Sequence, residues 1–320
     1  MKAVVYEKYG SPEVLHTKNI EKPEPKAGEV LIKIGGSGLN PVDTYFRKGI
    51  RPVSSFPFIP HFDLGGTVEE VGANVTYVKK GDRVWATNVT GTCAEYVTCD
   101  ESKVFPLPKR VTDVEGAALA MPFMTAHLSL HYRANVRPGE TVLIYGGAGA
   151  VGQAAIQLAK KAGLTIIATA SNEEKASICK KAGANEVLLY KETDIVEKVN
   201  EVTDDQGVDL ILEMSLSENI EKDLDMIKLG GKIVTIGSPK DNTPKLPWRK
   251  LNQKHASLMG VLLFTAPTEV LRRAGEEISR LFEQKSIFAH VGATFSFDEA
   301  EKAHEAIENQ QVNGSIVLTP

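Results

Sequence analysis

The pattern of apolar and polar positions changes near residue 113 of the 320-residue chain. Before that point, short apolar runs alternate with glycine- and proline-rich turns. The strand-like runs include Val4–Tyr6, Val30–Ile34, Gly66–Val71, Arg83–Trp85 and Ala94–Thr98. The turn signals between them include Tyr9–Pro12, Gly35–Gly38 and Lys80–Asp82. Short strands at regular spacing predict a compact, barrel-like β domain.

After residue 113, strand-like and helix-like segments alternate. Val114–Arg133 has a helical pattern, which Pro122 interrupts. The expected strands are Thr141–Tyr145, Thr165–Ala170, Glu186–Tyr190, Val208–Glu213, Lys232–Ile236 and Ser257–Phe264. The expected helices are Ala150–Ala162, Glu173–Ala182, Asp194–Val202, Glu218–Ile227 and Glu269–Gln284. Because parallel strands need crossover connections, this alternation predicts an α/β fold with a doubly wound parallel sheet.

The C-terminal segment returns to the pattern of the first part. Val291–Phe295 and Ser315–Leu318 are expected strands, and Asp298–Asn309 is an expected helix. We therefore expect the C-terminal segment to fold back onto the N-terminal domain.

Composition excludes several classes of protein. The net charge is −4 and the basic residues are scattered, so no Lys/Arg block indicates a nucleic-acid or membrane surface. The apolar run at the N-terminus is too short for a signal peptide or a membrane anchor. Three cysteines are too few for a disulfide framework. We expect a cytoplasmic globular enzyme.

The segment Thr141–Gly152 carries the clearest chemical signal. An apolar strand runs into a glycine cluster, and a small-residue helix follows; Gly147, Gly149 and Gly152 satisfy G-x-G-x-x-G. Glycine lets the backbone approach phosphate, and the helix start offers free N–H groups. The segment predicts a dinucleotide site in which backbone N–H groups hold the pyrophosphate. The expected donors are Gly147, Ala148, Gly149, Ala150 and Val151.

The end of the second strand favours NADPH over NADH. An NAD site usually has an acidic residue there, but this strand ends in Thr-Ala followed by Ser171 and Asn172. The neutral corner leaves room for a 2′-phosphate, to which Lys175 can add charge and Tyr190 a hydroxyl group. Glu173 and Glu174 lie close by. They either stabilise the helix N-terminus or repel the phosphate.

Segments spread over most of the chain resemble one family. They are Gly38–Tyr45, Gly65–Gly72, Lys80–Val84, Ala117–Pro122 with Thr125 and Ala126, the glycine turn, Gly207–Met214, Lys222–Leu224, Gly230–Lys232 and Met259–Phe264. On these segments the chain resembles the zinc-free quinone oxidoreductase (zeta-crystallin) branch of the medium-chain dehydrogenase/reductase superfamily. The resemblance implies a GroES-like β-barrel catalytic domain over residues 1–124 and 265–320. It also implies a Rossmann dinucleotide-binding domain over residues 125–264, and hydride transfer from NADPH to a quinone in the interdomain cleft.

The resemblance also bears on metal binding. Where zinc alcohol dehydrogenases of this superfamily place their catalytic ligands, this chain has Asn40, Phe62 and Met121. These side chains are not zinc ligands, so we expect no metal. Without a Lewis acid, an acceptor that is easily reduced, such as a quinone or a conjugated carbonyl, fits best. His61 stands where the branch usually has glycine, and we favour a packed histidine over a donor to substrate.

The remaining site residues follow from the resemblance. Asn40 and Tyr45 are the catalytic candidates at the substrate end and are also expected to contact the cofactor. Their alternative roles are a turn before Pro41 and a packed aromatic ring. Asn219 is either a cofactor contact or an exposed helix residue. The other expected cofactor contacts are Thr125, Ser171, Lys175, Tyr190, Gly237, Ser238, Val261, Leu262 and Leu263.

Two other functions stay open. The same features suit a reductase of conjugated enones or alkenals. A nucleotide-binding, crystallin-like or RNA-binding protein is the third reading, although no basic groove with interleaved aromatic residues supports RNA binding. The apolar final strand Met259–Phe264 would be an exposed edge, so we expect a homodimer or homotetramer.

Overall fold

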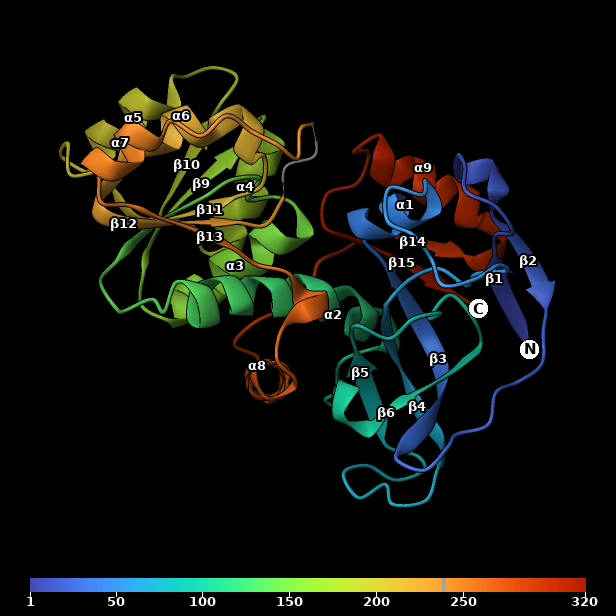
Figure 1. Cartoon of the computed structure of the whole chain (residues 1–320). Coiled ribbons are helices and arrows are strands. Elements are labelled where there is room, and N and C mark those ends of the chain that lie inside the picture. The colour runs from blue at the N-terminus through green and yellow to red at the C-terminus, as the bar shows by residue number, and fades with distance from the viewer. Residues whose placement is uncertain (238–239) are drawn as a thin grey trace. The chain divides into compact units, whose positions relative to one another are not determined.

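The structure is a computed structural model that describes residues 1–237 and 240–320. The chain divides into two compact units. The first unit comprises residues 1–124 and 267–320, and the second comprises residues 125–266 (Figure 1). Helix α2 (Asp113–His127) runs from the first unit into the second, and Leu128–Arg133 continues it as a π-helix.

The first unit is built on an extensive β-sheet. Its strand order is β14-β15-β3-β4-β5-β7, with β6 paired to β3, and β1 and β2 form a separate ladder. The strands are β1 (Lys2–Val5), β2 (His16–Asn19), β3 (Glu29–Leu39), β4 (Asp63–Val71), β5 (Arg83–Ala86), β6 (Tyr96–Asp100), β7 (Val104–Pro106), β14 (Val291–Ser296) and β15 (Ser315–Thr319). The helices α1 (Pro41–Arg47), α8 (Thr268–Glu283) and α9 (Ala300–Glu308) belong to the same unit. Apolar residues of β3, β4 and β5 form its buried core.

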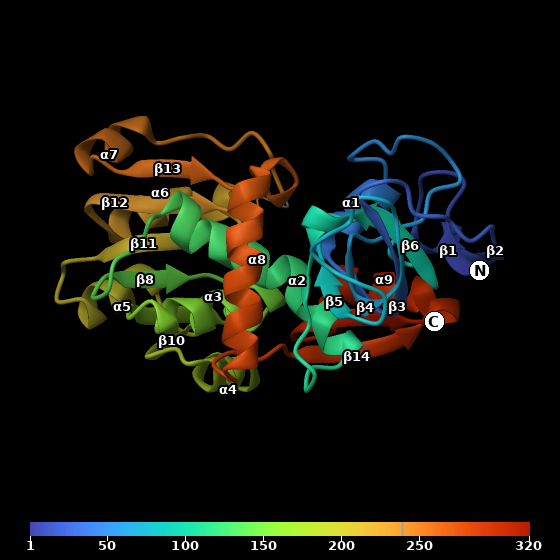
Figure 2. The same ribbon diagram turned by 90° about the horizontal axis from the view of Figure 1, so that it is seen from below.

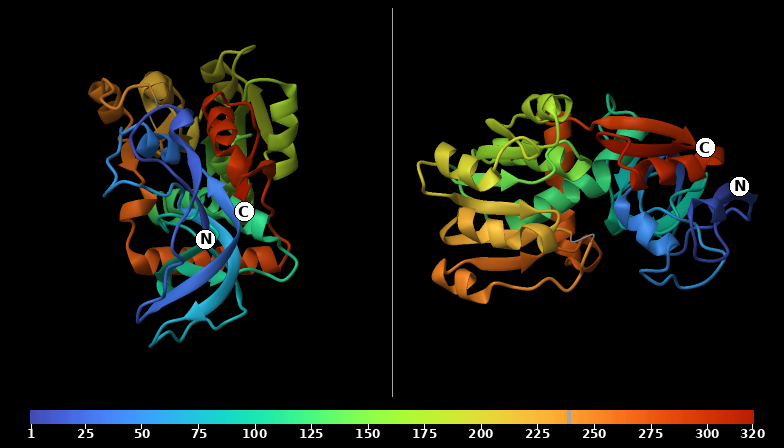
Figure 3. Two further views of the ribbon diagram at one scale, coloured as in Figure 1. Left: turned by 90° about the vertical axis from the view of Figure 1, so that its right-hand side faces the viewer. Right: turned by 90° about the horizontal axis from the view of Figure 1, so that it is seen from above.

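The C-terminal segment is part of this first sheet. Strand β15 pairs antiparallel with β3, and Val317 lies opposite Gly38. Figure 3 shows the red C-terminal strands in the same unit as the blue N-terminal strands. The prediction that the C-terminal segment folds back onto the N-terminal domain is confirmed.

The expected turn at Gly35–Gly38 is wrong, because these residues lie inside the eleven-residue strand β3. They are glycines for a packing reason. A Cβ on Gly36 would lie 3.0 Å from the carbonyl oxygen of Asp113, and one on Gly38 would lie 2.7 Å from that of Ala117. Both oxygens belong to α2. The absence of side chains therefore lets this helix cross the strand at backbone distance.

The second unit is a doubly wound parallel sheet. Within the described residues, its strand order is β10-β9-β8-β11-β12-β13, and Figure 2 shows β13, β12, β11 and β8 side by side. The strands are β8 (Thr141–Ile144), β9 (Thr165–Ala170), β10 (Glu186–Leu189), β11 (Val208–Glu213), β12 (Ile227–Thr235) and β13 (Ser257–Gly260). The helices are α3 (Ala150–Lys161), α4 (Glu173–Ala182), α5 (Ile195–Val202), α6 (Leu216–Met226) and α7 (Trp248–Gln253).

Helices cover both faces of this second sheet. Helices α5 and α6 bury Val199, Ile220 and Leu224 against Ile211 and Ile233 of the strands, and α3 lies on the other face (Figure 1). The strand order reverses direction between β8 and β11. Ligands of such sheets bind at the carboxyl ends of the strands beside this reversal.

Three expected boundaries differ from the structure. Helix α2 continues through Pro122, because the helix is buried on all sides and packing offsets the lost hydrogen bond. The strand expected over Ser257–Phe264 ends at Gly260, and Leu263–Thr265 forms a 3₁₀ turn. Strand β12 begins at Ile227, where the sequence predicts the last residue of a helix. An apolar run does not by itself distinguish a strand from the turn that follows it.

Candidate functional site

The glycine turn after β8 leaves little space for side chains. Gly146 has φ +61°, a left-handed conformation that favours glycine. A Cβ on Gly147 would lie 2.7 Å from Cys179 Sγ, and one on Gly152 would lie 2.8 Å from Gly147 Cα. A Cβ on Gly149 would meet the Gly146 carbonyl oxygen only at 3.3 Å. Gly147 and Gly152 therefore close the turn against α3 and α4, whereas a Cβ on Gly149 would meet a single backbone atom.

The predicted N–H donors of this turn differ in their availability. The Gly147 N–H donates to the Thr169 carbonyl oxygen at 3.0 Å, and the Gly149 N–H donates to that of Gly146 at 3.0 Å. These two groups hold the turn together. Ala150 and Val151 begin α3, where backbone N–H groups have no acceptor inside the helix. The start of α3 therefore retains donors that can bind an anion.

Ser171, Lys175 and Tyr190 lie near one corner of the second sheet. Leu189 pairs with Ala170 at the ends of β10 and β9, so Ser171 and Tyr190 follow the two strands side by side. The Tyr190 N–H donates to the Ala170 carbonyl oxygen at 3.2 Å, and the Tyr190 side chain is half exposed. Asn172 caps α4 by accepting from the Lys175 N–H at 2.9 Å. Ser171 and Tyr190 thus lie at this corner, and Lys175 belongs to the first turn of α4, which follows Ser171 in the chain.

Asn219 is neither exposed nor unpartnered. Its Nδ2 lies 3.1 Å and 3.3 Å from the two carboxylate oxygens of Glu213, the last residue of β11. The Ser215 N–H also donates to this carboxylate. Burial raises the pKa of both Glu213 and Asp223, and the Tyr145 hydroxyl donates to Asp223 at 3.0 Å. Glu213 thus holds the Asn219 amide at the end of β11.

The remaining predicted contacts of the second unit are dispersed. The Gly237 carbonyl oxygen accepts from the Leu216 N–H at 3.3 Å. Ser238 lies outside the described residues. Val261, Leu262 and Leu263 follow β13 and are not part of an edge strand; Leu262 is exposed and Leu263 is buried. Thr125 is buried, and its carbonyl oxygen accepts from the Ser129 hydroxyl at 2.8 Å.

In the first unit, Asn40 is tied to a buried carboxylate. Its Nδ2 donates to Asp63 Oδ2 at 2.8 Å. Asp63 also accepts from the Thr87 hydroxyl at 2.6 Å and from the Met121 N–H at 3.0 Å. Burial raises the pKa of Asp63 to about 7, against the three hydrogen bonds that lower it. Sequence reasoning missed Asp63, although an acidic residue at the start of a buried strand was a usable signal.

Asn40 is also the N-cap of α1. It forms a capping box with Asp43, whose carboxylate accepts from the Asn40 N–H at 2.6 Å. Asp43 therefore stabilises the start of the helix. Tyr45 lies one turn further along α1 and is only partly buried.

His61 is a fully buried, packed histidine, as expected from the sequence. Its Nδ1 lies 2.9 Å from Ser37 Oγ, and its Nε2 lies 3.1 Å from Nε2 of His304 on α9. Burial lowers the pKa of His61 to about 3 and that of His304 well below its usual value. Both rings therefore stay neutral. One of them donates to the other across this contact.

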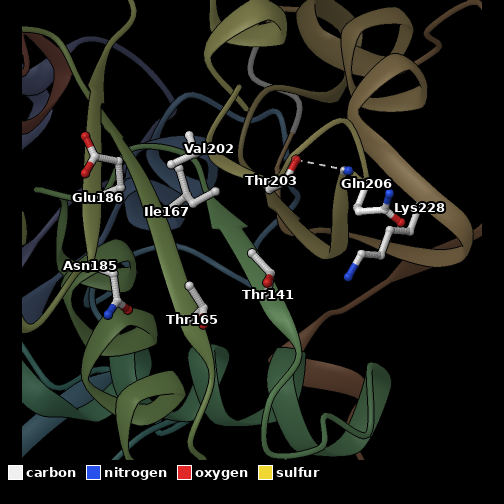
Figure 4. A pocket seen from close by; sticks show the side chains of 10 residues that line it. Thr141, Thr165, Ile167, Asn185, Glu186, Val202, Thr203, Gln206 and Lys228 are labelled. Carbon is white, nitrogen blue, oxygen red and sulfur yellow. Dashed lines mark hydrogen bonds between the residues drawn. The ribbon is translucent and has the colours of Figure 1, made fainter. Parts of the chain in front are cut away.

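A surface pocket of about 310 Å³ lies elsewhere on the second unit (Figure 4). Thr141, Thr165 and Glu186, the first residues of three strands, contribute to its lining. It therefore lies at the amino ends of the strands, opposite the glycine turn, and is not the dinucleotide site. In the described residues, no group of three or more His, Cys, Asp or Glu side chains could hold a metal ion. No helix within the described ranges is long and apolar enough to cross a membrane.

Comparisons with known proteins place this geometry in a family. Residues 26–109 match the alcohol dehydrogenase GroES-like domain, and residues 150–280 match the zinc-binding dehydrogenase family. Human quinone oxidoreductase is 34% identical over 324 residues, which cover 99% of this chain and 97% of the human protein. Quinone oxidoreductase of Pseudomonas aeruginosa is 31% identical and covers 100% of this chain and 99% of its own.

Solved structures agree with this placement. Escherichia coli quinone oxidoreductase complexed with NADPH superimposes with a TM-score of 0.91 at 28% identity, over the full length of both chains. A mycobacterial protein complexed with NADPH gives a TM-score of 0.92 at 32% identity, also over both full chains. The chain is an oxidoreductase that belongs to the quinone oxidoreductase branch of the medium-chain dehydrogenase/reductase superfamily.

Proposed function

We propose that this protein is an NADPH-dependent quinone reductase. The observation that carries the proposal is full-length similarity to quinone oxidoreductases, combined with a glycine turn built to receive a dinucleotide. Two similar structures contain NADPH. Sequence similarity over nearly the whole chain covers both units, so the proposal concerns the entire enzyme.

The residues of the second unit fit NADPH. The backbone N–H groups of Ala148, Ala150 and Val151 would hold the pyrophosphate, because Gly147 and Gly149 use theirs within the turn. The corner after β9 has no acidic side chain at Ser171, and Lys175 would pair with the 2′-phosphate beside the Tyr190 hydroxyl. Thr125, Gly237, Ser238, Asn219 and Val261–Leu263 remain candidate contacts for the rest of the cofactor.

NADPH supplies a hydride when it is bound, and the protein supplies position and hydrogen bonds. Asn40 and Tyr45 are the side chains that we assign to the substrate end. Each can donate a hydrogen bond to a quinone oxygen, which gains negative charge as the hydride arrives. The superfamily's zinc-ligand positions hold Asn40, Phe62 and Met121, which are unsuited to zinc. We therefore propose that hydrogen-bond donors, and not a metal, bind the quinone oxygen.

Steady-state kinetics test this function directly. NADPH and NADH are compared with a panel of ortho- and para-quinones and with conjugated enones as acceptors. Quinone turnover with a clear preference for NADPH is expected. Turnover of enones alone would favour the enone reductase instead, and preference for NADH would contradict the cofactor assignment.

We also infer self-association and a cytoplasmic location. Strand β13 lies at the edge of the second sheet (Figure 2), where unpaired backbone groups favour pairing with another copy. The three cysteines are buried and unbridged, as suits a reducing compartment. Light scattering of the purified enzyme measures the mass and distinguishes a dimer from a tetramer.

A further inference from the structure

The carboxylate of Asp63 has no exposed surface and accepts from three donors in the first unit. Two of those donors come from Asn40 and Met121, and both bind the same oxygen, Oδ2. The third is the Thr87 hydroxyl, which binds Oδ1. A buried charge is costly unless it is hydrogen-bonded. Asp63 meets this condition with three donors that come from separate parts of the first unit.

The contacts of Asn40 define how its amide is turned. Asn40 is the N-cap of α1, and its backbone carbonyl oxygen accepts from the Asp43 N–H at 3.0 Å, so the side-chain amide is not used to cap the helix. The amide nitrogen points to Asp63, which in its ionised form can only accept. The reversed amide would set its oxygen against a carboxylate. The ionised Asp63 carboxylate therefore favours one orientation of the Asn40 amide.

We propose that Asp63 is a positioning residue, which holds the Asn40 amide so that its second Nδ2–H is directed to the oxygen of the acceptor. An amide nitrogen carries two hydrogens, and Asp63 uses one of them. The other donates as the acceptor oxygen gains charge. This inference rests on the proposed function, since it assumes that Asn40 lies at the substrate end.

The protonation of Asp63 gives the proposal a measurable signature. A protonated carboxyl has lost the negative charge that strengthens the Asn40 contact, and its O–H can also donate to an amide oxygen, so it holds the Asn40 amide less firmly in one orientation. Activity toward the acceptor should therefore fall as the pH drops through about 7, the pKa of this carboxyl. Asp43 of α1 is a second buried acid of this region, and burial, together with the charge of Asp63, raises its pKa well above the usual value. Thr87 and Met121 bring no charge.

Two threonine variants separate positioning from general stability. Thr87→Val removes a donor to Asp63, whereas Thr92→Val removes an equally buried hydroxyl that contacts Ser37 at 3.2 Å. Asp63→Asn removes the ionisable group itself. The measurements are kcat and KM for a quinone and for NADPH from about pH 5.5 to 9, with NADPH affinity from fluorescence.

We expect a different result for each of the three variants. Asp63→Asn lowers kcat/KM for the quinone about 10-fold to 100-fold and abolishes the decline below pH 7, with NADPH affinity unchanged. Thr87→Val moves the midpoint of the decline to higher pH, because the ionised carboxylate loses a donor. Thr92→Val does not change the pH dependence of kcat/KM. A decline that survives in Asp63→Asn, or equal profiles for the two threonine variants, would overturn the proposal.

A second readout does not depend on quinone turnover. The side-chain amide signals of Asn40 are identified in NMR spectra by their loss in Asn40→Ala. They should shift with pH around 7 in the wild type and stay constant in Asp63→Asn. Absence of quinone reduction would disprove the proposed function, whereas a pH-independent Asn40 amide in the wild type would disprove the role of Asp63.

Discussion

The glycines inside β3 and the glycines after β8 can be compared position by position. A Cβ on Gly38 would press on the Ala117 carbonyl oxygen at 2.7 Å and on Asp63 Cβ at 2.9 Å. A Cβ on Gly149 would meet only the Gly146 carbonyl oxygen, at 3.3 Å. The first run makes room for the protein's own helix α2, while Gly149 in the second run is less crowded by the protein, and we assign the space beside it to a ligand. Similar composition thus serves folding in one unit and binding in the other.

The largest expected effect is on folding in the first run. Gly38→Ala should lower the free energy of unfolding by up to about 3 kcal/mol, because the new methyl group overpacks rigid backbone. Urea unfolding followed by fluorescence measures the loss. Gly260→Ala is the control, since a Cβ there has nothing within 4 Å. Equal stability of the two variants would contradict the packing role of Gly38.

The same substitution in the second run should cost less stability than Gly38→Ala and should weaken binding. Gly149→Ala should raise the dissociation constant for NADPH about 10-fold, which corresponds to about 1.4 kcal/mol. The methyl group would stand where we place the pyrophosphate. Fluorescence titration measures the affinity, and urea unfolding checks that stability is retained. An unchanged affinity, or a loss of stability like that of Gly38→Ala, would remove the distinction between the two runs.

A smaller effect concerns the selectivity for NADPH over NADH at Lys175. Lys175→Ala should raise the KM for NADPH roughly 5-fold, because an exposed ion pair contributes about 1 kcal/mol. The KM for NADH should stay unchanged, since NADH has no 2′-phosphate. Parallel assays with both cofactors measure the two constants. Equal effects on NADPH and NADH would rule out a 2′-phosphate contact at Lys175.

The smallest expected effect is a pH dependence of the free energy of unfolding, which arises from two histidines that pack beside the first run. Ser37, within β3, contacts His61, which in turn contacts His304. Burial lowers the pKa of both rings. Unfolded histidines therefore take up protons that the folded pair excludes, and stability is complete above about pH 7 and falls below it.

A variant isolates this contribution. Between about pH 7 and pH 6, wild-type protein should lose roughly 0.7 kcal/mol more stability than His304→Asn, which has one titrating histidine fewer. Urea unfolding at both pH values measures the difference. A wild type and variant with the same pH dependence would mean that His304 is protonated in the folded state.

Prediction from sequence worked best where the signal is local. Strands β9 and β11 and helix α4 have the predicted bounds, since alternation, caps and turn residues lie within a few positions of each other. The second glycine run could also be predicted, because its strand, turn and helix signals are consecutive in the sequence. The first run resembled a turn because glycine permits turns, and only the crossing of α2 explains why it is a strand. The residues next to this run in the sequence give no sign that α2 packs against it.

The site was predicted unevenly for the same reason. Asn40, Lys175 and the glycine turn could be named from motifs, but their partners could not. Asp63 lies 23 positions from Asn40. Glu213 was visible only as the end of a strand, although it holds the Asn219 amide. Val261–Leu263 were expected in a strand, and the structure places them after its end.

By itself the sequence determined the two patterns along the chain, which are short strands with turns and then alternating strands and helices. It also determined the dinucleotide turn and the neutral corner beside it. These depend on backbone preferences and charges over a few consecutive residues. The tertiary structure alone decided which buried polar groups meet, such as His61 with His304, which are 243 positions apart. Such pairs form because a buried donor or acceptor must find a partner wherever the packed chain brings one.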